Sequence, residues 1–290
     1  MKPAPVEYLA ADSLDQAVDV LASYGDEAKV VAGGQSLVPM LNMRLAQPEV
    51  LVDISRLGEL RDVTQGSASV LYGAATTHSR FEDKVVPDAG GGLMAAAASG
   101  IGYRAVRNRG TIAGSLAHAD ASAEWPVVLA ALGATIHVRS VRGTRELPAA
   151  TFLRGFFTSV LESDEVIVAV EVPNLGPDAT WGYLKFARKD GEFAESLAVA
   201  VLRWTDGRVA HAELWLGAAS GMPLAVALSE DEIGVTGEIV PRTRLTNAVT
   251  GLVGAARTAE DRYRLNLHVT TLSRALRQAV QRRSAHDAAV

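Results

Sequence analysis

Two glycine-containing segments hold the residue types best suited to chemistry in this chain of 290 residues. The first, VVAGGQSLVP at residues 30–39, follows an apolar run that ends at Ala32. The second, RNRGTIAGS, spans residues 107–115. Glycine leaves backbone N–H groups uncovered and adopts positive φ, so successive amides can converge on an anion. Two such donor sets facing each other would suit the diphosphate of a dinucleotide better than a lone phosphate.

The candidate donors are backbone amides together with neighbouring hydroxyl groups. The first segment offers Gly33, Gly34, Gln35 and Ser36, and the second offers Thr111, Ala113, Gly114 and Ser115. The alternative is that both segments are ordinary turns, because glycine after a strand usually makes one. The motifs alone leave both interpretations open.

Other motifs give weaker indications. GIGYRA at residues 100–105 matches G-x-G-x-x-A but follows an alanine-rich helical stretch, whereas a dinucleotide fingerprint needs a preceding strand. The sequence contains neither a P-loop nor an H-E-x-x-H motif, and Ser36 is outside a G-x-S-x-G elbow. His118 and Asp120, next to Glu124, suggest acid–base work or a metal site, but a capping role is preferred. We therefore assign no catalytic and no metal-ligating residue.

Composition excludes several classes of function. A net charge of −5 and a pI near 5.7 give no basic footprint for nucleic acid. The absence of cysteine excludes disulfides, zinc fingers and an iron–sulfur cluster held by the chain's own thiolates. The longest apolar stretch, 125–136, is far shorter than the roughly 20 residues of a membrane span, and the N-terminus lacks a signal peptide. We expect a soluble cytoplasmic protein.

The elements that must position the two segments follow from hydrophobic spacing. Ser13 to Gln16 fits a capping box, and the apolar residues after it predict a helix up to Tyr24. Short buried strands are expected at 29–32 and 50–54. The first 55 residues or so therefore predict a small α/β lobe whose glycine turn follows a strand.

The rest of the chain alternates between helices and strands before ending in a helical tail. A further segment begins at 70–74, strands are expected at 135–140 and 166–172, and helices at 76–81, 93–99 and 125–132. A linker at 174–180 precedes a hairpin at Asp206-Gly207, flanked by strands at 197–204 and 209–216, and a helical tail at 244–281. These elements predict an α+β fold in three lobes, with boundaries at 1–56, 57–177 and 178–290.

Both glycine segments resemble signatures of one protein family. AGGQSLVPMLNMR at 32–44 resembles the first FAD-binding signature of the FAD-binding (medium) subunit of molybdenum hydroxylases. That family includes carbon monoxide dehydrogenase, nicotine dehydrogenase and xanthine dehydrogenase. RNRGTIAGSLAHAD at 107–120 resembles the second signature, and shorter likenesses occur at 155–157, 183–185 and 263–264. The resemblance implies an FAD-binding fold of the vanillyl-alcohol-oxidase (PCMH) type in two lobes, followed by a C-terminal α+β domain.

The resemblance also implies roles for individual residues. Residues 32–36 and 111–115 would cradle the FAD diphosphate, Glu124 would contact the cofactor through a ribose hydroxyl, and Lys185 would lie near the isoalloxazine ring. The full implied set is Ala32, Gly33, Gly34, Gln35, Ser36, Leu37, Ile101, Thr111, Ala113, Gly114, Ser115, Ala117, Asp120, Glu124, Ile167 and Lys185. Three positions depart from the family pattern, namely Ala113 for glycine, Ala121 for proline and Glu192 for aspartate.

The implied function is that of an oxidoreductase subunit. In the family, substrate is oxidised at a molybdopterin on a large subunit, and electrons pass through [2Fe–2S] clusters on a small subunit to FAD on the medium one. A dimer of heterotrimers is common, and a chain without cysteine fits this division of labour. Two alternatives stay open: a stand-alone FAD oxidase, and a non-catalytic module that binds a nucleotide or coenzyme A.

Overall fold

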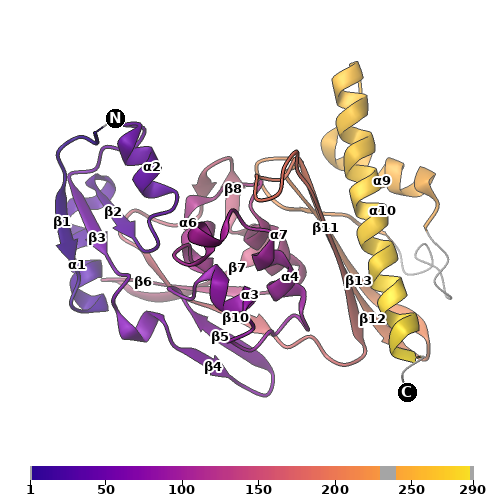
Figure 1. The fold of residues 1–290 in the computed structure, drawn as a ribbon, viewed down its shortest axis with the longest axis horizontal. Helices are drawn as coiled ribbons and strands as arrows, with labels where there is room; N and C mark the ends of the chain where they lie inside the picture. The colour runs from indigo at the N-terminus through magenta and orange to yellow at the C-terminus, as the bar shows by residue number, and fades with distance from the viewer. Residues whose placement is uncertain (1, 229–239, 288–290) are drawn as a thin grey trace.

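A computed structural model describes residues 2–228 and 240–287, with side chains described up to residue 284. Three β-sheets follow one another along the long axis of the molecule (Figure 1). The first sheet lies at the N-terminal end, and the long C-terminal helix α10 (Ala259–Asp287) lies against the third. The fold is mixed α and β, as expected.

The first sheet is parallel, with strand order β1-β3-β2, where the strands are β1 (Glu7–Ala10), β2 (Ala28–Val31) and β3 (Val50–Asp53). Helix α1 (Leu14–Tyr24) begins where the capping box predicted, because the Ser13 hydroxyl accepts the Gln16 N–H at 3.1 Å. The Gln16 side-chain oxygen accepts the Asp12 N–H at 2.7 Å, whereas a capping box would use the N–H of the next residue, Ser13. Strand β1 was not predicted, because its mostly exposed residues show no apolar run.

The second sheet is antiparallel. Its order is β4-β5-β10-β6-β7, with strands β4 (Val63–Gln65), β5 (Ser69–Gly73), β6 (Thr135–Ser140), β7 (Gly143–Pro148) and β10 (Val166–Pro173). A small hairpin pairs β8 (Leu153–Gly155) with β9 (Thr158–Ser159). The helices of this region are α3 (His78–Glu82), α4 (Leu93–Ser99), α5 (Arg104–Arg107), α6 (Ile112–His118) and α7 (Glu124–Ala131). The second sheet contacts α1 through β6 and α6 through β10.

The third sheet is a meander of β11 (Ala179–Phe186), β12 (Ser196–Thr205), β13 (Arg208–Gly217) and β14 (Leu224–Ala225). The predicted two-residue hairpin turn is confirmed, since Asp206 and Gly207 both adopt positive φ, at 50° and 73°. The predicted helical tail over 244–281 consists of two helices, because α9 (Arg242–Val253) ends at Gly254, whose φ is 89°, before α10 begins.

Two hydrophobic cores share the third sheet. Along β12 the side chains alternate, so that Leu197, Val199 and Val201 join a core common to the first two sheets and α7. The intervening residues of β12 pack against α10 in a second core. Each sheet falls within one of the ranges proposed as lobes. No helix within residues 2–228 and 240–287 is long and apolar enough to cross a membrane.

Candidate functional site

The first glycine segment is a loop of unpaired donors between β2 and helix α2 (Leu37–Asn42). Gly34 adopts a φ of 71°, which a residue with a side chain rarely does. The five backbone N–H groups of residues 33 to 37 donate no hydrogen bond to any residue of the described chain. Successive uncommitted amides of this kind form a cradle for an anion.

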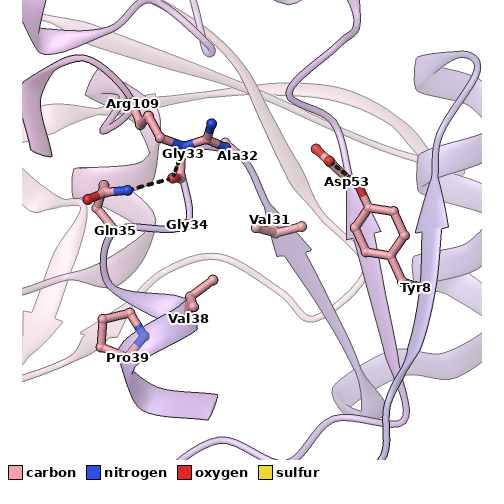
Figure 2. Close-up of a pocket in the computed structure, with 10 residues that line it drawn as sticks. All are labelled: Tyr8, Val31, Ala32, Gly33, Gly34, Gln35, Val38, Pro39, Asp53 and Arg109. Atoms are coloured by element: carbon pink, nitrogen blue, oxygen red, sulfur yellow. Dashed lines mark hydrogen bonds between the residues drawn. The ribbon is translucent and has the colours of Figure 1, made fainter. Parts of the chain in front are cut away.

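This loop lines a pocket of about 500 Å³ (Figure 2). On the opposite wall, the Tyr8 hydroxyl donates to the Asp53 carboxylate, which also accepts the Ser55 N–H at 2.7 Å. Backbone and side-chain hydrogen bonds to this carboxylate outweigh the effect of partial burial and lower the pKa of Asp53. The pocket is lined by Tyr8, Val31, Ala32, Gly33, Gly34, Gln35, Val38, Pro39, Asp53 and Arg109.

The second glycine segment becomes a helix earlier than predicted. The Thr111 hydroxyl caps α6 by accepting the Gly114 N–H at 3.0 Å, and the Thr111 carbonyl accepts the Ser115 N–H at 3.0 Å. The expectation that the amides of Gly114 and Ser115 are free donors is therefore wrong, because the helix cap uses both. Of the four predicted donors, Thr111 and Ala113 keep N–H groups without an acceptor in the described chain.

The two segments lie in direct contact. A Cβ atom on Gly33 would lie 2.1 Å from the Arg109 carbonyl oxygen, so only glycine permits this approach. The Arg109 Nε donates to the Gly33 carbonyl at 3.3 Å (Figure 2). Arg109 was not among the predicted site residues, although it lies within the RNRGTIAGS motif and supplies the charge that an anion site needs.

A buried ion pair forms a second cluster, between the start of α7 and β11. The Lys185 ammonium donates to the Glu124 carboxylate at 2.6 Å and to the Gly100 carbonyl at 2.9 Å. The exposed fractions of the two side chains are 4% for Glu124 and 11% for Lys185. Burial raises the pKa of Glu124, and the positive charge of Lys185 opposes this effect. The structure thus joins two predicted site residues that lie 61 positions apart.

The hydroxyl group of Tyr183 belongs to the same cluster. It is buried and has no hydrogen-bond partner in the described chain. Burial and the Glu124 carboxylate both raise its pKa well above the ordinary value, so the phenol stays protonated. Sequence reasoning missed this residue because only the fold shows that its hydroxyl is buried without a partner.

The remaining predicted residues have simpler surroundings. Ile167 lies in β10 and is 5% exposed, whereas Ile101 lies in the loop after α4. GIGYRA therefore follows a helix, which confirms that it is no Rossmann fingerprint. Asp120 accepts the Ser122 N–H at 2.8 Å, and the His118 ring packs on Phe157 with centroids 5.2 Å apart, so local structure accounts for both.

The last two predicted residues lie in helices α2 and α6. Leu37 is the first residue of α2, and Ala117 lies on the exposed side of α6. Neither side chain makes a polar contact, so each side chain can contribute only apolar contact, while Leu37 also brings the last of the five free N–H groups. Within the described residues, no group of three His, Asp or Glu side chains is placed to hold a metal ion.

Comparisons with known proteins assign the chain to a family. The family described as "FAD binding domain in molybdopterin dehydrogenase" matches residues 4–175. The 6-hydroxypseudooxynicotine dehydrogenase complex subunit alpha of Paenarthrobacter nicotinovorans is 40% identical over 202 residues, which is 70% of this chain and 68% of that protein. The carbon monoxide dehydrogenase medium chain of Hydrogenophaga pseudoflava is 33% identical over 261 residues, 90% of each chain.

A solved structure gives the same result along almost the whole chain. It is carbon monoxide dehydrogenase from Hydrogenophaga pseudoflava, in a form that lacks the Mo-pyranopterin moiety of the molybdenum cofactor. One of its chains matches with a TM-score of 0.88 and 32% identity, covering 97% of this chain and 99% of that one. The chain belongs to the FAD-binding medium subunits of molybdenum hydroxylase-type dehydrogenases. It is an oxidoreductase subunit whose cofactor is FAD.

The residues at the glycine loop fit this cofactor. A diphosphate offers several anionic oxygen acceptors, and residues 33 to 37 offer successive amide donors without acceptors of their own. The close contact between the two segments places the start of α6 beside the loop. The structure leaves the amides of the first segment free and uses those of Gly114 and Ser115 at the start of α6.

Proposed function

We propose that this chain is the electron-transfer flavoprotein of a molybdenum hydroxylase complex. It binds FAD at the two glycine segments, receives electrons from [2Fe–2S] clusters of a small partner subunit and passes them to an external acceptor. A large subunit with molybdopterin oxidises the substrate, and the assembly is a dimer of heterotrimers. The relatives named as a complex subunit and as medium chains support an assembly of several subunits.

The observation that carries this proposal is the row of free amides at residues 33 to 37. Backbone N–H groups near a folded interior are normally paired, so five uncommitted donors in succession indicate a ligand that pairs them. The free Arg109 charge beside the loop and the Gly33 contact support a ligand site between two segments that are far apart in the sequence. Electron acceptance and donation are the chemistry that bound FAD supplies.

The residues of the chain bind the cofactor and set its surroundings. In the proposed complex, residues 33 to 37 hold the diphosphate, while Ile101 and Lys185 lie toward the ring system. Glu124 fixes the Lys185 ammonium in orientation and offsets its charge, so the cluster is close to neutral overall. Tyr183 adds a protonated hydroxyl to this cluster and carries no negative charge.

The division of labour between subunits follows from composition. Iron–sulfur clusters are held by cysteine thiolates, with histidine replacing some of them in Rieske centres, and this chain has no cysteine. In the proposed complex the clusters therefore belong to a partner. The stand-alone oxidase would instead need a base aimed at a substrate, and the polar candidates Asp120 and Glu124 are occupied by backbone and by Lys185.

The test is anaerobic electron transfer between separate subunits. The oxidised flavoprotein is mixed with the pre-reduced iron–sulfur subunit, and flavin absorption is followed together with cluster absorption. We expect the flavin to bleach while the clusters reoxidise. Turnover of an organic substrate by the flavoprotein alone, with no electron exchange between subunits, would instead establish the oxidase.

A further inference from the structure

We propose that Arg109 is a ligand of the cofactor diphosphate and that Arg109 and Gln35 together orient the Gly33–Gly34 peptide toward it. This inference rests on the proposed FAD site and adds residues to it. The side-chain roles of Arg109 and Gln35 follow from three features: a carbonyl held from two sides, an arginine without a carboxylate partner, and a pocket with charged groups on opposite walls (Figure 2).

The first feature is the Gly33 carbonyl, which accepts two side-chain donors. Gln35 Nε2 donates to it at 3.1 Å, and Arg109 Nε donates at 3.3 Å. All peptide bonds of the described chain are trans, so the N–H of Gly34 points opposite to the Gly33 carbonyl. Holding the carbonyl therefore fixes the direction of the Gly34 N–H, the second of the five free donors. A donor fixed before binding loses less entropy when the ligand arrives.

The second feature is the uncommitted part of the Arg109 side chain. A guanidinium has five N–H donors, and only the Nε group of Arg109 has an acceptor within the described residues. The neighbouring Arg104 and Arg107 differ, because they are paired with Glu82, and Arg104 also with Asp83. Arg109 thus brings an unpaired cation and two Nη groups to the wall of the pocket that holds the free amides.

The third feature is the distribution of charge across the pocket. Asp53 lies on the wall opposite Arg109 (Figure 2), with its carboxylate bound by Tyr8 and by the Ser55 N–H. The lowered pKa of Asp53 keeps this wall negative at neutral pH, while Arg109 and the amides make the glycine wall positive. An anionic group placed between them is attracted to the glycine wall and repelled from the other. Planar, multidentate recognition of phosphate oxygens is the task for which arginine is suited.

The test compares Arg109→Met and Arg109→Lys in the full chain after removal of FAD. Two probes are used: ADP, which carries the diphosphate, and adenosine, which does not. We expect Arg109→Met to weaken ADP binding at least tenfold and to leave the affinity for adenosine within twofold. Arg109→Lys restores part of the ADP affinity, because it keeps the charge but cannot donate in the same way to the Gly33 carbonyl. Gln35→Met, which removes the other donor to this carbonyl, should weaken ADP binding severalfold.

Arg104→Met is the matched control, since it removes an exposed arginine of the preceding helix α5 without changing the glycine loop. Equal loss of ADP and adenosine affinity in Arg109→Met, or wild-type ADP affinity, would overturn the inference. Loss of ADP affinity together with failed electron exchange between subunits would leave the inference standing and refute the electron-transfer function. A wild-type chain that binds neither FAD nor ADP would refute both. Circular dichroism and urea unfolding verify that each variant is folded.

Discussion

Gly33 shows how a single missing side chain can create a cofactor site. Its ideal Cβ would lie 2.1 Å from the carbonyl oxygen of Arg109 and 2.6 Å from the carbonyl carbon. Both atoms belong to the backbone and cannot rotate aside, so any larger residue must push the two segments apart. The requirement for glycine here is a packing requirement, whereas at Gly34 it comes from positive φ.

Gly33→Ala should therefore weaken FAD binding. We expect an FAD affinity at least tenfold below that of wild type, and hence a lower FAD content in the purified protein, because loss of one or two charge-assisted contacts, at about 1.4 kcal/mol per tenfold in the dissociation constant, already gives such a factor. Flavin released by denaturation and measured per chain gives the result. Gly58→Ala is the control, since a Cβ at Gly58 meets nothing within 4 Å. Equal FAD contents in the two variants would contradict the cradle.

The Glu124–Lys185 pair should behave as a buried unit. Glu124→Gln leaves the Lys185 ammonium, whose side chain is 11% exposed, without its counter-charge. We expect a loss of about 3–5 kcal/mol in the free energy of unfolding, as for other buried pairs that lose one partner. The double variant Glu124→Met with Lys185→Met should lose less free energy of unfolding than Glu124→Met alone or Lys185→Met alone. Urea unfolding in a double-mutant cycle measures this, and additive losses would argue against coupling.

At the residue scale, the sequence predicted the glycine loop better than its surroundings. Gly33 and Gly34 could be identified because glycine pairs after a strand are visible in the sequence. The Lys185–Glu124 contact could not be derived from spacing, since it joins residues 61 positions apart. Arg109 was missed because three arginines lie within 104–109, and only the fold shows which of them has no carboxylate partner.

Helices α3 and α7 are joined by a histidine that must stay neutral. The Trp125 indole N–H donates to His78 Nδ1 at 3.0 Å, and both side chains are buried. Burial lowers the pKa of His78 from an ordinary value of 6.5 to about 4, and the charge of Arg107 adds to the effect. The folded protein thus keeps this ring unprotonated over a range in which the unfolded chain binds a proton.

Stability should consequently fall in mild acid. Between pH 6.5 and about 4 the unfolded state binds one more proton at His78 than the folded state. The contribution of neutral His78 to the free energy of unfolding is therefore complete above pH 6.5. It is lost at up to about 1.4 kcal/mol per pH unit as the pH falls. Urea unfolding of wild type and His78→Gln at pH 7 and pH 5 tests this. The variant should show the shallower pH dependence, and equal pH dependence in the two proteins would contradict the role of His78.

At the element scale, helices and turns were predicted correctly where the sequence contains all of their local signals. Helix α1 had a cap and an apolar face, and the Asp206-Gly207 turn had the residues that positive φ requires. The segment after Thr111 was predicted as a turn because of Gly114, but the capping hydroxyl decided the outcome. The tail was predicted as helical, but the break at Gly254 was not, because it lies within an otherwise helical composition.

On the scale of the whole molecule, the third sheet is covered on both faces. One face of β12 packs toward α7 and the other toward α10, so the C-terminal lobe shares a core with the rest of the chain. The helix lies close to the sheet at Gly182, where a Cβ would be 1.7 Å from the Ala275 carbonyl oxygen. Sequence spacing predicted the strands, but it could not predict which helix covers each face.

Gly182→Ala should therefore loosen α10 without emptying the cofactor site. The added methyl group must displace backbone, and we expect a cost of about 2–4 kcal/mol, as for other overpacked positions where backbone must shift. Hydrogen exchange should increase in α10 and β11, while FAD content stays near the wild-type level. Faster exchange spread evenly over the first two sheets would instead show that the proposed boundary between 57–177 and 178–290 separates no independent unit.

The most direct test of the central claim is the visible absorption spectrum of this chain, purified with its co-produced neighbouring subunits, combined with a count of FAD per chain. We predict flavin absorption, one FAD per chain and additional iron–sulfur absorption that stays with the neighbours when the subunits are separated. A complex that takes up no flavin, or flavin that resides on another subunit, would contradict the assignment of residues 33 to 37 as the FAD cradle.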